Sequence, residues 1–242
     1  QALWDVYRRN MALRMRFSET NGEPYQYTEE ESRPLVIDFV DFSEKSNPEK
    51  AYRVWCQKQA RTIFSLTAEV LCSFSIFKIS SNDTGFYIRL HHLVSDGWSV
   101  QLITNQIAEA YEKRTESAMN VCSFPSYLAV VEAEEKEIFS KRLMQHKSFW
   151  NEMTQHLEDL PERETSYSLK ATRMTFQLDK SMSGKIKEFT LRHSISLNTF
   201  IIGIYILYVL KTTKKKYVTL GLPLLGRSSR TERETCGTFT NT

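Results

Sequence analysis

The order of strand-like and helix-like segments limits most strongly the folds that this chain can adopt. Several short segments have the spacing and composition of strands: 25–27, 35–42, 70–79, 86–90, 172–178 and 217–222. Longer segments with helical spacing or helix-start signals predict helices: 2–14, 48–64, 100–110, 126–137, 140–157, 180–193 and 196–211. Polar residues 80–84 predict the turn of a hairpin. Because hairpins and crossovers are mixed, we expect an α+β fold with mixed α/β layers rather than a regular βαβ array.

The polar stretch 158–170 is the best candidate for a linker, because it contains Pro161 and few apolar residues. The sequence therefore predicts a first lobe over residues 1–165 and a second lobe over residues 172–242.

Charge and hydropathy exclude two classes of partner. The net charge is only +3 and is spread along the chain, so we expect no nucleic acid partner, and the run Lys211–Lys216 is interpreted as a solvated helix end. The most apolar run, 200–210, has 11 residues, whereas a membrane-spanning helix needs about 20. A buried helix and no membrane association are predicted.

The cysteines predict a reducing compartment. They are far apart and form no CxxC pair: Cys56, Cys72, Cys122 and Cys236. Since no secretory signal is visible at Gln1, we expect reduced thiols and a cytoplasmic protein.

The segment His91–Trp98, with sequence HHLVSDGW, has the strongest functional signal. It lies where a predicted strand ends and a predicted helix begins, a place from which side chains can point into a cleft. If the extended backbone continues for two residues, His92 lies on the apolar face of the strand and His91 on the opposite face. A neutral imidazole there can accept a proton at cellular pH. Adjacent strand residues are poorly placed to bind one ion, so we expect no metal.

Asp96 and Gly97 each have two interpretations. Asp96 can cap the following helix through its carboxylate, or it can be held by an arginine that fixes the turn carrying His92. These roles are compatible, and both are structural. Gly97 can allow close backbone approach or a positive φ, or it can be an ordinary glycine at a helix start.

His91-His92-x-x-x-Asp96-Gly97 resembles the HHxxxDG motif of nonribosomal peptide synthetase condensation domains, in the chloramphenicol acetyltransferase-like superfamily. Further segments resemble motifs of that family in the same order: 9–17, 124–127 with 149–150, 221–227 (GxPxxGR) and 237–242 (GxFxNT). The resemblance covers nearly the whole chain and implies a two-lobed fold with the first lobe nearly complete and the second partial. The chain departs from it at Asn10-Met11, where the family has His-Glu. The family's first motif is also absent before Gln1, so we expect a fragment incomplete at both ends, which can be inactive alone.

The resemblance implies an enzyme that forms an amide bond between a thioester donor and an amine acceptor. Both substrates are bound to peptidyl carrier domains through phosphopantetheine, so the domain needs no cofactor of its own. Adenylation and carrier domains are expected in the same polypeptide, whose product is a secondary metabolite such as a peptide antibiotic. His92 is the expected catalytic residue, as general base or as a group that positions the amine. His91, Asp96 and Gly97 support the motif, with Arg227 as the first candidate partner of Asp96 and Arg14 as the second.

Two alternative functions remain open. A free-standing acyltransferase of the same superfamily would use coenzyme A or carrier thioesters and the same histidine. A condensation-like domain without activity would serve only as a docking platform, although intact His92, Asp96 and Gly97 argue against it.

Overall fold

The computed structural model describes residues 1–28, 35–67, 69–115, 124–138, 140–155 and 172–242. The chain forms two compact units, the first made of residues 1–140 and 223–242 and the second of residues 141–222. These units differ from the expected lobes, because the last twenty residues return to the first unit. The predicted linker, 158–170, lies outside the described residues.

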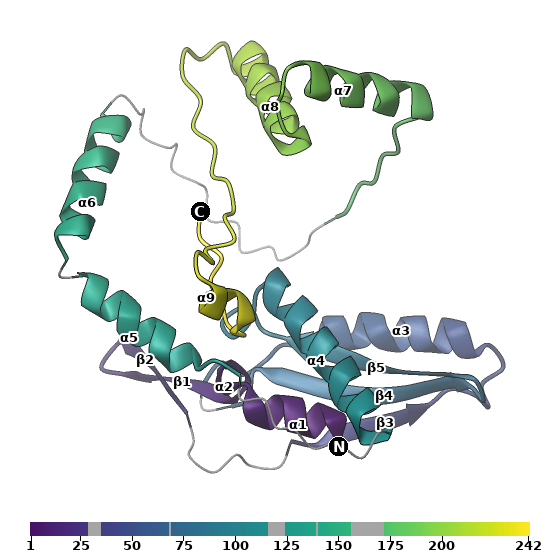
Figure 1. Cartoon of the computed structure of the whole chain (residues 1–242). Coiled ribbons are helices and arrows are strands. Elements are labelled where there is room, and N and C mark those ends of the chain that lie inside the picture. The colour runs from purple at the N-terminus through teal and green to yellow at the C-terminus, as the bar shows by residue number, and fades with distance from the viewer. Residues whose placement is uncertain (29–34, 68, 116–123, 139, 156–171) are drawn as a thin grey trace. The chain divides into compact units, whose positions relative to one another are not determined.

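A three-stranded sheet forms the centre of the first unit (Figure 1). Its order is β3 (Ile37–Asp41), β4 (Cys72–Ser80) and β5 (Asp83–Leu90), with β3 parallel and β5 antiparallel to β4. The predicted hairpin of the last two strands is therefore confirmed, and Phe74 pairs with Ile88. The parallel pairing of β3 with β4 requires a crossover, and helix α3 (Pro48–Ala60) lies within it.

The two faces of this sheet are covered by different helices. One face carries Phe74 and joins the hydrophobic core with α1 (Ala2–Arg9) and α4 (Gly97–Thr115), where Ile103 is fully buried. On the opposite face, the Phe77 ring packs against Tyr52 of α3 at 4.4 Å between ring centres. The sheet is thus covered on both sides, which fixes the position of its ends.

The N-terminal helix breaks where the sequence predicted it to continue. The prediction of one helix over 2–14 is wrong, because Asn10 is extended between α1 and α2 (Met11–Arg14). The buried Asn10 amide donates to the Val6 carbonyl at 2.8 Å and to the Gln106 amide oxygen at 2.7 Å. These side-chain bonds compensate for the interrupted helix.

A second hairpin follows α2. Strand β1 (Met15–Thr20) pairs with β2 (Glu23–Thr28) in antiparallel register. Asn21 and Gly22 between them both have positive φ, at 55° and 83°, as two-residue hairpin turns prefer. The sequence predicted only part of β2 and missed β1.

Helices α3 and α5 form close to their predicted positions, whereas α9 was not predicted. Helix α3 begins at Pro48, and the Asn47 side chain accepts from the Lys50 amide at 3.0 Å. Helix α5 spans Tyr127–Ile138. Helix α9 (Arg230–Glu234) is short, and it lies in the returning segment, where Leu224 and Asn241 form an isolated bridge.

The second unit contains α6 (Lys141–Thr154), α7 (Lys180–Arg192) and α8 (Leu197–Thr213). These helices form close to their predicted positions, but the prediction that the apolar run 200–210 is buried is wrong, because no residue of α8 is buried in the described structure. The predicted strands 172–178 and 217–222 do not form. A strand needs a neighbour for its backbone groups, and the described part of this unit offers none. No single described helix is long and apolar enough to cross a membrane; α7 and α8 meet that test only together, across a bend of 103°.

Candidate active site

The paired histidines lie in a turn that follows β5. The strand ends at Leu90, and the Val94 amide donates to the His91 carbonyl at 3.1 Å. The expectation that the extended backbone continues to His92 is therefore wrong. Because the turn ends the alternation of the strand, His92 does not continue the apolar face and is exposed in the described structure.

His91 is held in place at the end of β5 by two hydrogen bonds and one ring contact. Its backbone amide donates to the Leu71 carbonyl at 2.9 Å, which extends the sheet contact by one residue. Its Nδ1 accepts from the Leu93 amide at 3.1 Å, so the neutral ring carries its proton on Nε2. The Phe64 ring lies edge-on to the imidazole at 6.1 Å and holds it beside the end of the strand.

Asp96 caps α4, in agreement with one of the two interpretations made from the sequence. Its Oδ1 accepts from the Ser99 amide at 2.8 Å, and its backbone carbonyl accepts from the Val100 amide at 3.1 Å. A carboxylate in this position satisfies amide groups that have no partner within the helix. The cap fixes the direction in which α4 leaves the turn.

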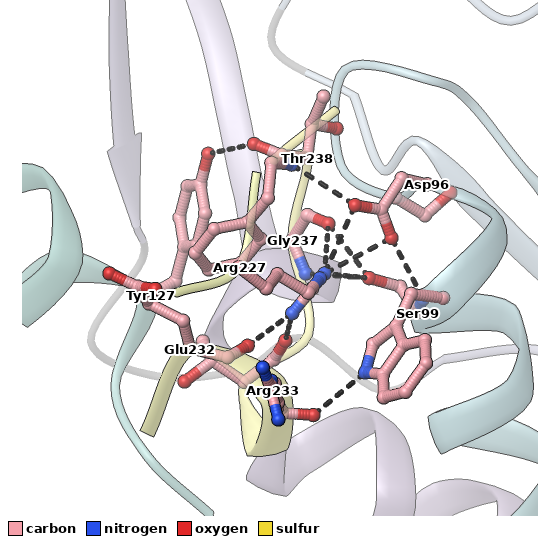
Figure 2. Close-up of polar contacts among 12 residues, drawn as sticks. Asp96, Ser99, Tyr127, Arg227, Glu232, Arg233, Gly237 and Thr238 are labelled. Carbon is pink, nitrogen blue, oxygen red and sulfur yellow. Dashed lines mark hydrogen bonds and ion pairs between the residues drawn. The ribbon is translucent and has the colours of Figure 1, made fainter. Parts of the chain in front are cut away.

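Asp96 is also paired with Arg227, which confirms the predicted ion pair (Figure 2). The Arg227 Nη2 atom lies 3.0 Å from Asp96 Oδ1 and 3.1 Å from Oδ2, and the two side chains are 0% and 1% exposed. Arg14, the second candidate, is the last residue of α2, and its carbonyl accepts from the Arg16 guanidinium at 2.9 Å. The first candidate thus occupies the carboxylate.

Arg227 is itself bound by backbone carbonyls around it. Its Nη1 donates to the carbonyls of Glu232 and Thr235 at the end of α9, and its Nη2 donates to the Gly237 carbonyl at 3.1 Å. The guanidinium also lies 3.9 Å above the centre of the Phe239 ring. Most of the cation is therefore in contact with compensating groups, as burial of a charge requires.

The pKa of the Asp96 carboxyl lies below its usual range. Burial alone favours the neutral acid, but backbone hydrogen bonds from Ser99 and Phe239, together with the positive charge of Arg227, outweigh it. Asp96 therefore remains ionised and fully engaged, so it is a structural anchor rather than a proton carrier.

Residues 237–239, which we call the clasp, each form hydrogen bonds with the HHxxxDG segment or with the first turn of α4. Gly237 exchanges bonds with the Ser99 hydroxyl, which donates to its carbonyl at 2.7 Å and accepts from its amide at 3.0 Å. Thr238 donates its hydroxyl to the His92 carbonyl. The Phe239 amide donates to Asp96 Oδ2 at 3.1 Å. The clasp thus connects the end of the chain with the turn and with the start of α4.

Glycine is required at two positions, Gly226 near the clasp and Gly237 within it. Gly226 has φ +67°, and an added Cβ would lie 1.9 Å from the Phe239 carbonyl oxygen. Gly237 has φ +153°, and its added Cβ would lie 2.3 Å from the Tyr127 ring. Gly97 differs, because its φ is not positive and an added Cβ meets nothing within 4 Å. Of its two interpretations, the ordinary glycine at a helix start fits the described residues.

Several supporting residues were not predicted from the sequence. The Ser99 hydroxyl accepts from Arg227 at 3.0 Å, the Trp98 indole donates to the Arg233 carbonyl at 2.8 Å, and the Tyr127 hydroxyl donates to the Thr238 carbonyl at 3.1 Å (Figure 2). These bonds involve backbone groups or distant segments, which leave no spacing pattern. The resemblance of 124–127 and 237–242 to family motifs was the available signal. Among the described residues, no group of three or more His, Cys, Asp or Glu side chains could hold a metal ion.

The family model described as "Condensation domain" matches residues 1–242, the full length of this chain. The chain belongs to this family. Surfactin synthase subunit 1 of Bacillus subtilis (strain 168) is 27% identical over the whole chain, which corresponds to 7% of that protein. Gramicidin S synthase 2 of Aneurinibacillus migulanus is 24% identical over the whole chain and 5% of that protein.

Solved condensation domains share the fold. The first condensation domain of the calcium-dependent antibiotic synthetase, in complex with a substrate analogue, superposes with a TM-score of 0.79 at 22% identity, over 99% of this chain and 58% of that chain. The starter condensation domain of rhizomide synthetase gives a TM-score of 0.71 at 20% identity, over 99% and 55%. This condensation domain chain therefore spans somewhat more than half the length of these solved chains.

Proposed function

We propose that this condensation domain forms an amide bond between a carrier-bound acyl or peptidyl thioester and a carrier-bound aminoacyl amine. The observation that supports it best is that the turn carrying His92 is fixed on both sides. The strand bond of His91 to Leu71 holds the first side, and the buried pair of Asp96 and Arg227 holds the second. A site built in this way keeps a reactive group in place while substrates move past it.

The chemistry requires alignment more than activation. An α-amino group has a pKa of about 7.7 to 8.0, so much of the acceptor is already nucleophilic at cellular pH. The amine nitrogen attacks the thioester carbonyl, a C–N bond forms, the C–S bond breaks, and the thiolate leaves. The nitrogen loses one proton and the departing sulfur takes one up. His92 contacts the amine and either accepts that proton or orients the nitrogen, and no acyl-enzyme is needed.

The other motif residues act through the backbone in this proposal. Asp96 and Arg227 hold the turn and the start of α4, and His91 anchors the end of β5. Gly97 has no role beyond that of a helix-start residue in this proposal, since an added Cβ would meet nothing within 4 Å. We assign Arg14 no contact with Asp96, because Arg227 occupies that carboxylate.

The partners follow from the substrates. We propose donor and acceptor peptidyl carrier domains, each presenting its thioester on phosphopantetheine, with adenylation and carrier domains in the same polypeptide. The two relatives named above are synthase proteins many times longer than this chain, which supports such an arrangement. A cytoplasmic location is part of the same proposal.

The test is the substitution His92→Ala in the full-length protein. Dipeptide formation is followed by mass spectrometry with carrier proteins loaded with a panel of aminoacyl-phosphopantetheines, and the fastest pair is retained. We expect the rate to fall by roughly 10²-fold, the size of a lost acid–base group, while the thermal midpoint stays unchanged because the ring is exposed.

His146→Ala is the matched control, since His146 is an exposed histidine on α6 and should leave the rate unaltered. A His92→Ala protein as fast as wild type would remove His92 from the reaction. Carrier binding without any product would favour the docking platform. Turnover of coenzyme A thioesters without carriers would favour the free-standing acyltransferase.

A further inference from the structure

The turn that carries His92 is held mainly through the residues beside it. His91 is tied to Leu71, and the Ser95 hydroxyl donates to the His91 carbonyl at 3.2 Å. His92 itself is exposed and belongs to no strand or helix. Among the residues that the structure describes, its hydrogen-bond partner is Thr238, whose hydroxyl donates to the His92 carbonyl. The peptide that follows His92 is therefore held at its carbonyl by Thr238, far along the sequence, and at its Leu93 amide by the His91 imidazole.

The position of Thr238 is determined by its neighbours. Gly237 is bonded to Ser99, Phe239 is bonded to Asp96, and the Thr238 carbonyl accepts from the Tyr127 hydroxyl at 3.1 Å (Figure 2). Its backbone is thus held on three sides, so its hydroxyl has a defined place. A donor that is fixed in advance loses little conformational freedom when it makes its bond.

We propose that Thr238 is a positioning residue for His92, acting through the His92 backbone carbonyl rather than on substrate. The direction of a Cα–Cβ bond follows from the peptide planes beside it, so fixing the 92–93 peptide limits where the imidazole can lie. Proton transfer and amine alignment depend on sub-ångström geometry, and a ring on a looser turn reaches the productive position less often. This inference rests on the proposed function of His92.

The substitution Thr238→Val tests the inference in the full-length protein, with the assay used for His92→Ala. Valine has nearly the shape of threonine but lacks the hydroxyl. We expect kcat to fall about 3- to 10-fold, the scale of one lost hydrogen bond, with KM for both loaded carriers changed by less than about 2-fold. Thr238→Ser, which keeps a donor at this position, should restore most of the rate.

Two comparisons separate positioning from a general effect on folding. Thr240→Val alters an exposed threonine two residues further along and should leave kcat unchanged. In a His92→Ala background, Thr238→Val should change the remaining rate by less than about 2-fold, because residues that act through one group are not additive. If Thr238→Val is too unstable to assay, Thr238→Ala removes the same hydroxyl. It is then compared with Thr240→Val and tested in the His92→Ala background in the same way.

The outcomes also distinguish this inference from the function on which it rests. A slow His92→Ala protein together with a Thr238→Val protein of wild-type rate would overturn the role of Thr238 alone. An equal loss from Thr238→Val with and without His92 would likewise overturn it, because the hydroxyl would then act elsewhere. A fully active His92→Ala protein would instead overturn the proposed function.

Discussion

The buried pair of Asp96 and Arg227 is the feature on which the site most depends. Both charges are removed from water. Asp96 accepts from the Ser99 amide, and Arg227 donates to the Ser99 hydroxyl and to the Gly237 carbonyl. A buried ion pair adds little net stability compared with an apolar pair, but removing one partner leaves an uncompensated charge. The pair therefore defines the local structure more than it raises overall stability.

Asp96→Asn should destabilise the protein by about 3–5 kcal/mol. Asparagine keeps an acceptor for the helix cap, so the loss reports the unpaired charge of Arg227. Asp179→Asn is the control, because Asp179 caps α7 in an exposed position, and asparagine caps helices about as well as aspartate. Urea unfolding measures both; equal effects of the two substitutions would contradict a special role for the pair.

The difference between wild type and Asp96→Asn should also depend on pH. The pKa of Asp96 is lowered in the folded protein by the bonds from Ser99 and Phe239 and by Arg227, against the effect of burial. Its contribution to stability is complete above the unfolded value of about 3.9 and is lost as pH falls through the lowered folded pKa. The two unfolding free energies should therefore converge in acid, and a constant difference down to about pH 2 would contradict this.

At the level of single residues, the sequence pointed to the motif residues but not to most of the residues that hold them. The HHxxxDG spacing pointed to His92 and Asp96, and the resemblance pointed to Arg227. Ser99 and Thr238 were missed because they bond to backbone carbonyls and to groups over a hundred residues away, which leave no local pattern. The orientation of His92 was missed because a hydrogen-bonded turn, not a continued strand, follows Leu90.

At the level of elements, α9 shows how a short helix can support a distant residue. Ser229 and Glu232 form a complete capping box, and the Glu232 carboxylate also accepts from the Ser228 amide. The backbone hydrogen bond from Ser229 lowers the pKa of Glu232 most strongly, and the other hydrogen bonds from Ser228 and Ser229 lower it further. Slight burial acts in the opposite direction. The carbonyls at the other end of α9 hold Arg227, so the cap orders one side of the ion pair.

Ser229→Ala should lower the stability of α9 by about 1 kcal/mol, the usual loss when a helix cap is removed. Because α9 holds Arg227, amide hydrogen exchange over residues 227–239 should quicken by about 5-fold, whereas exchange in β4 stays the same. Ser229→Asn, which retains a good cap, is the matched control. Unchanged exchange in Ser229→Ala would show that the contacts of Arg227 alone order this segment.

Helices were predicted more accurately than strands because their signals are local. Caps at Asn47, Asp179 and Ser196 mark helix starts that the structure reproduces. Strands depend on a partner, so 172–178 remained without one, and β1 was recognisable only once paired with β2. The break at Asn10 depends on Gln106, almost a hundred residues away.

At the level of the whole molecule, the two units differ in how they bury apolar residues. The first has a continuous core around Tyr7, Phe74 and Ile103. In the second, α8 exposes apolar side chains on several sides: Leu197, Ile201, Ile204, Tyr205, Leu207 and Tyr208. A helix that is apolar all round is normally buried. The matched solved chains are nearly twice as long as this one.

The 242-residue polypeptide alone should therefore self-associate and bind a hydrophobic dye. Ile204→Lys combined with Leu207→Lys should weaken the association by at least about 10-fold, because charges on α8 would have to be desolvated. Val36→Lys changes an exposed apolar residue of the first unit and serves as the control. Sedimentation measures the association; a monomer at micromolar concentration would contradict the prediction.

The return of residues 223–242 to the first unit has a consequence for protein synthesis. Arg227 follows Asp96 by 131 residues, so at about 5–20 residues per second a ribosome needs roughly 7 to 26 seconds to add the cation after the carboxylate. During that interval the nascent chain carries Asp96 without the counter-charge of Arg227 and without the clasp. The turn that carries His92 can thus reach its final structure only late, and chaperones that bind incomplete chains have ample time to act on it.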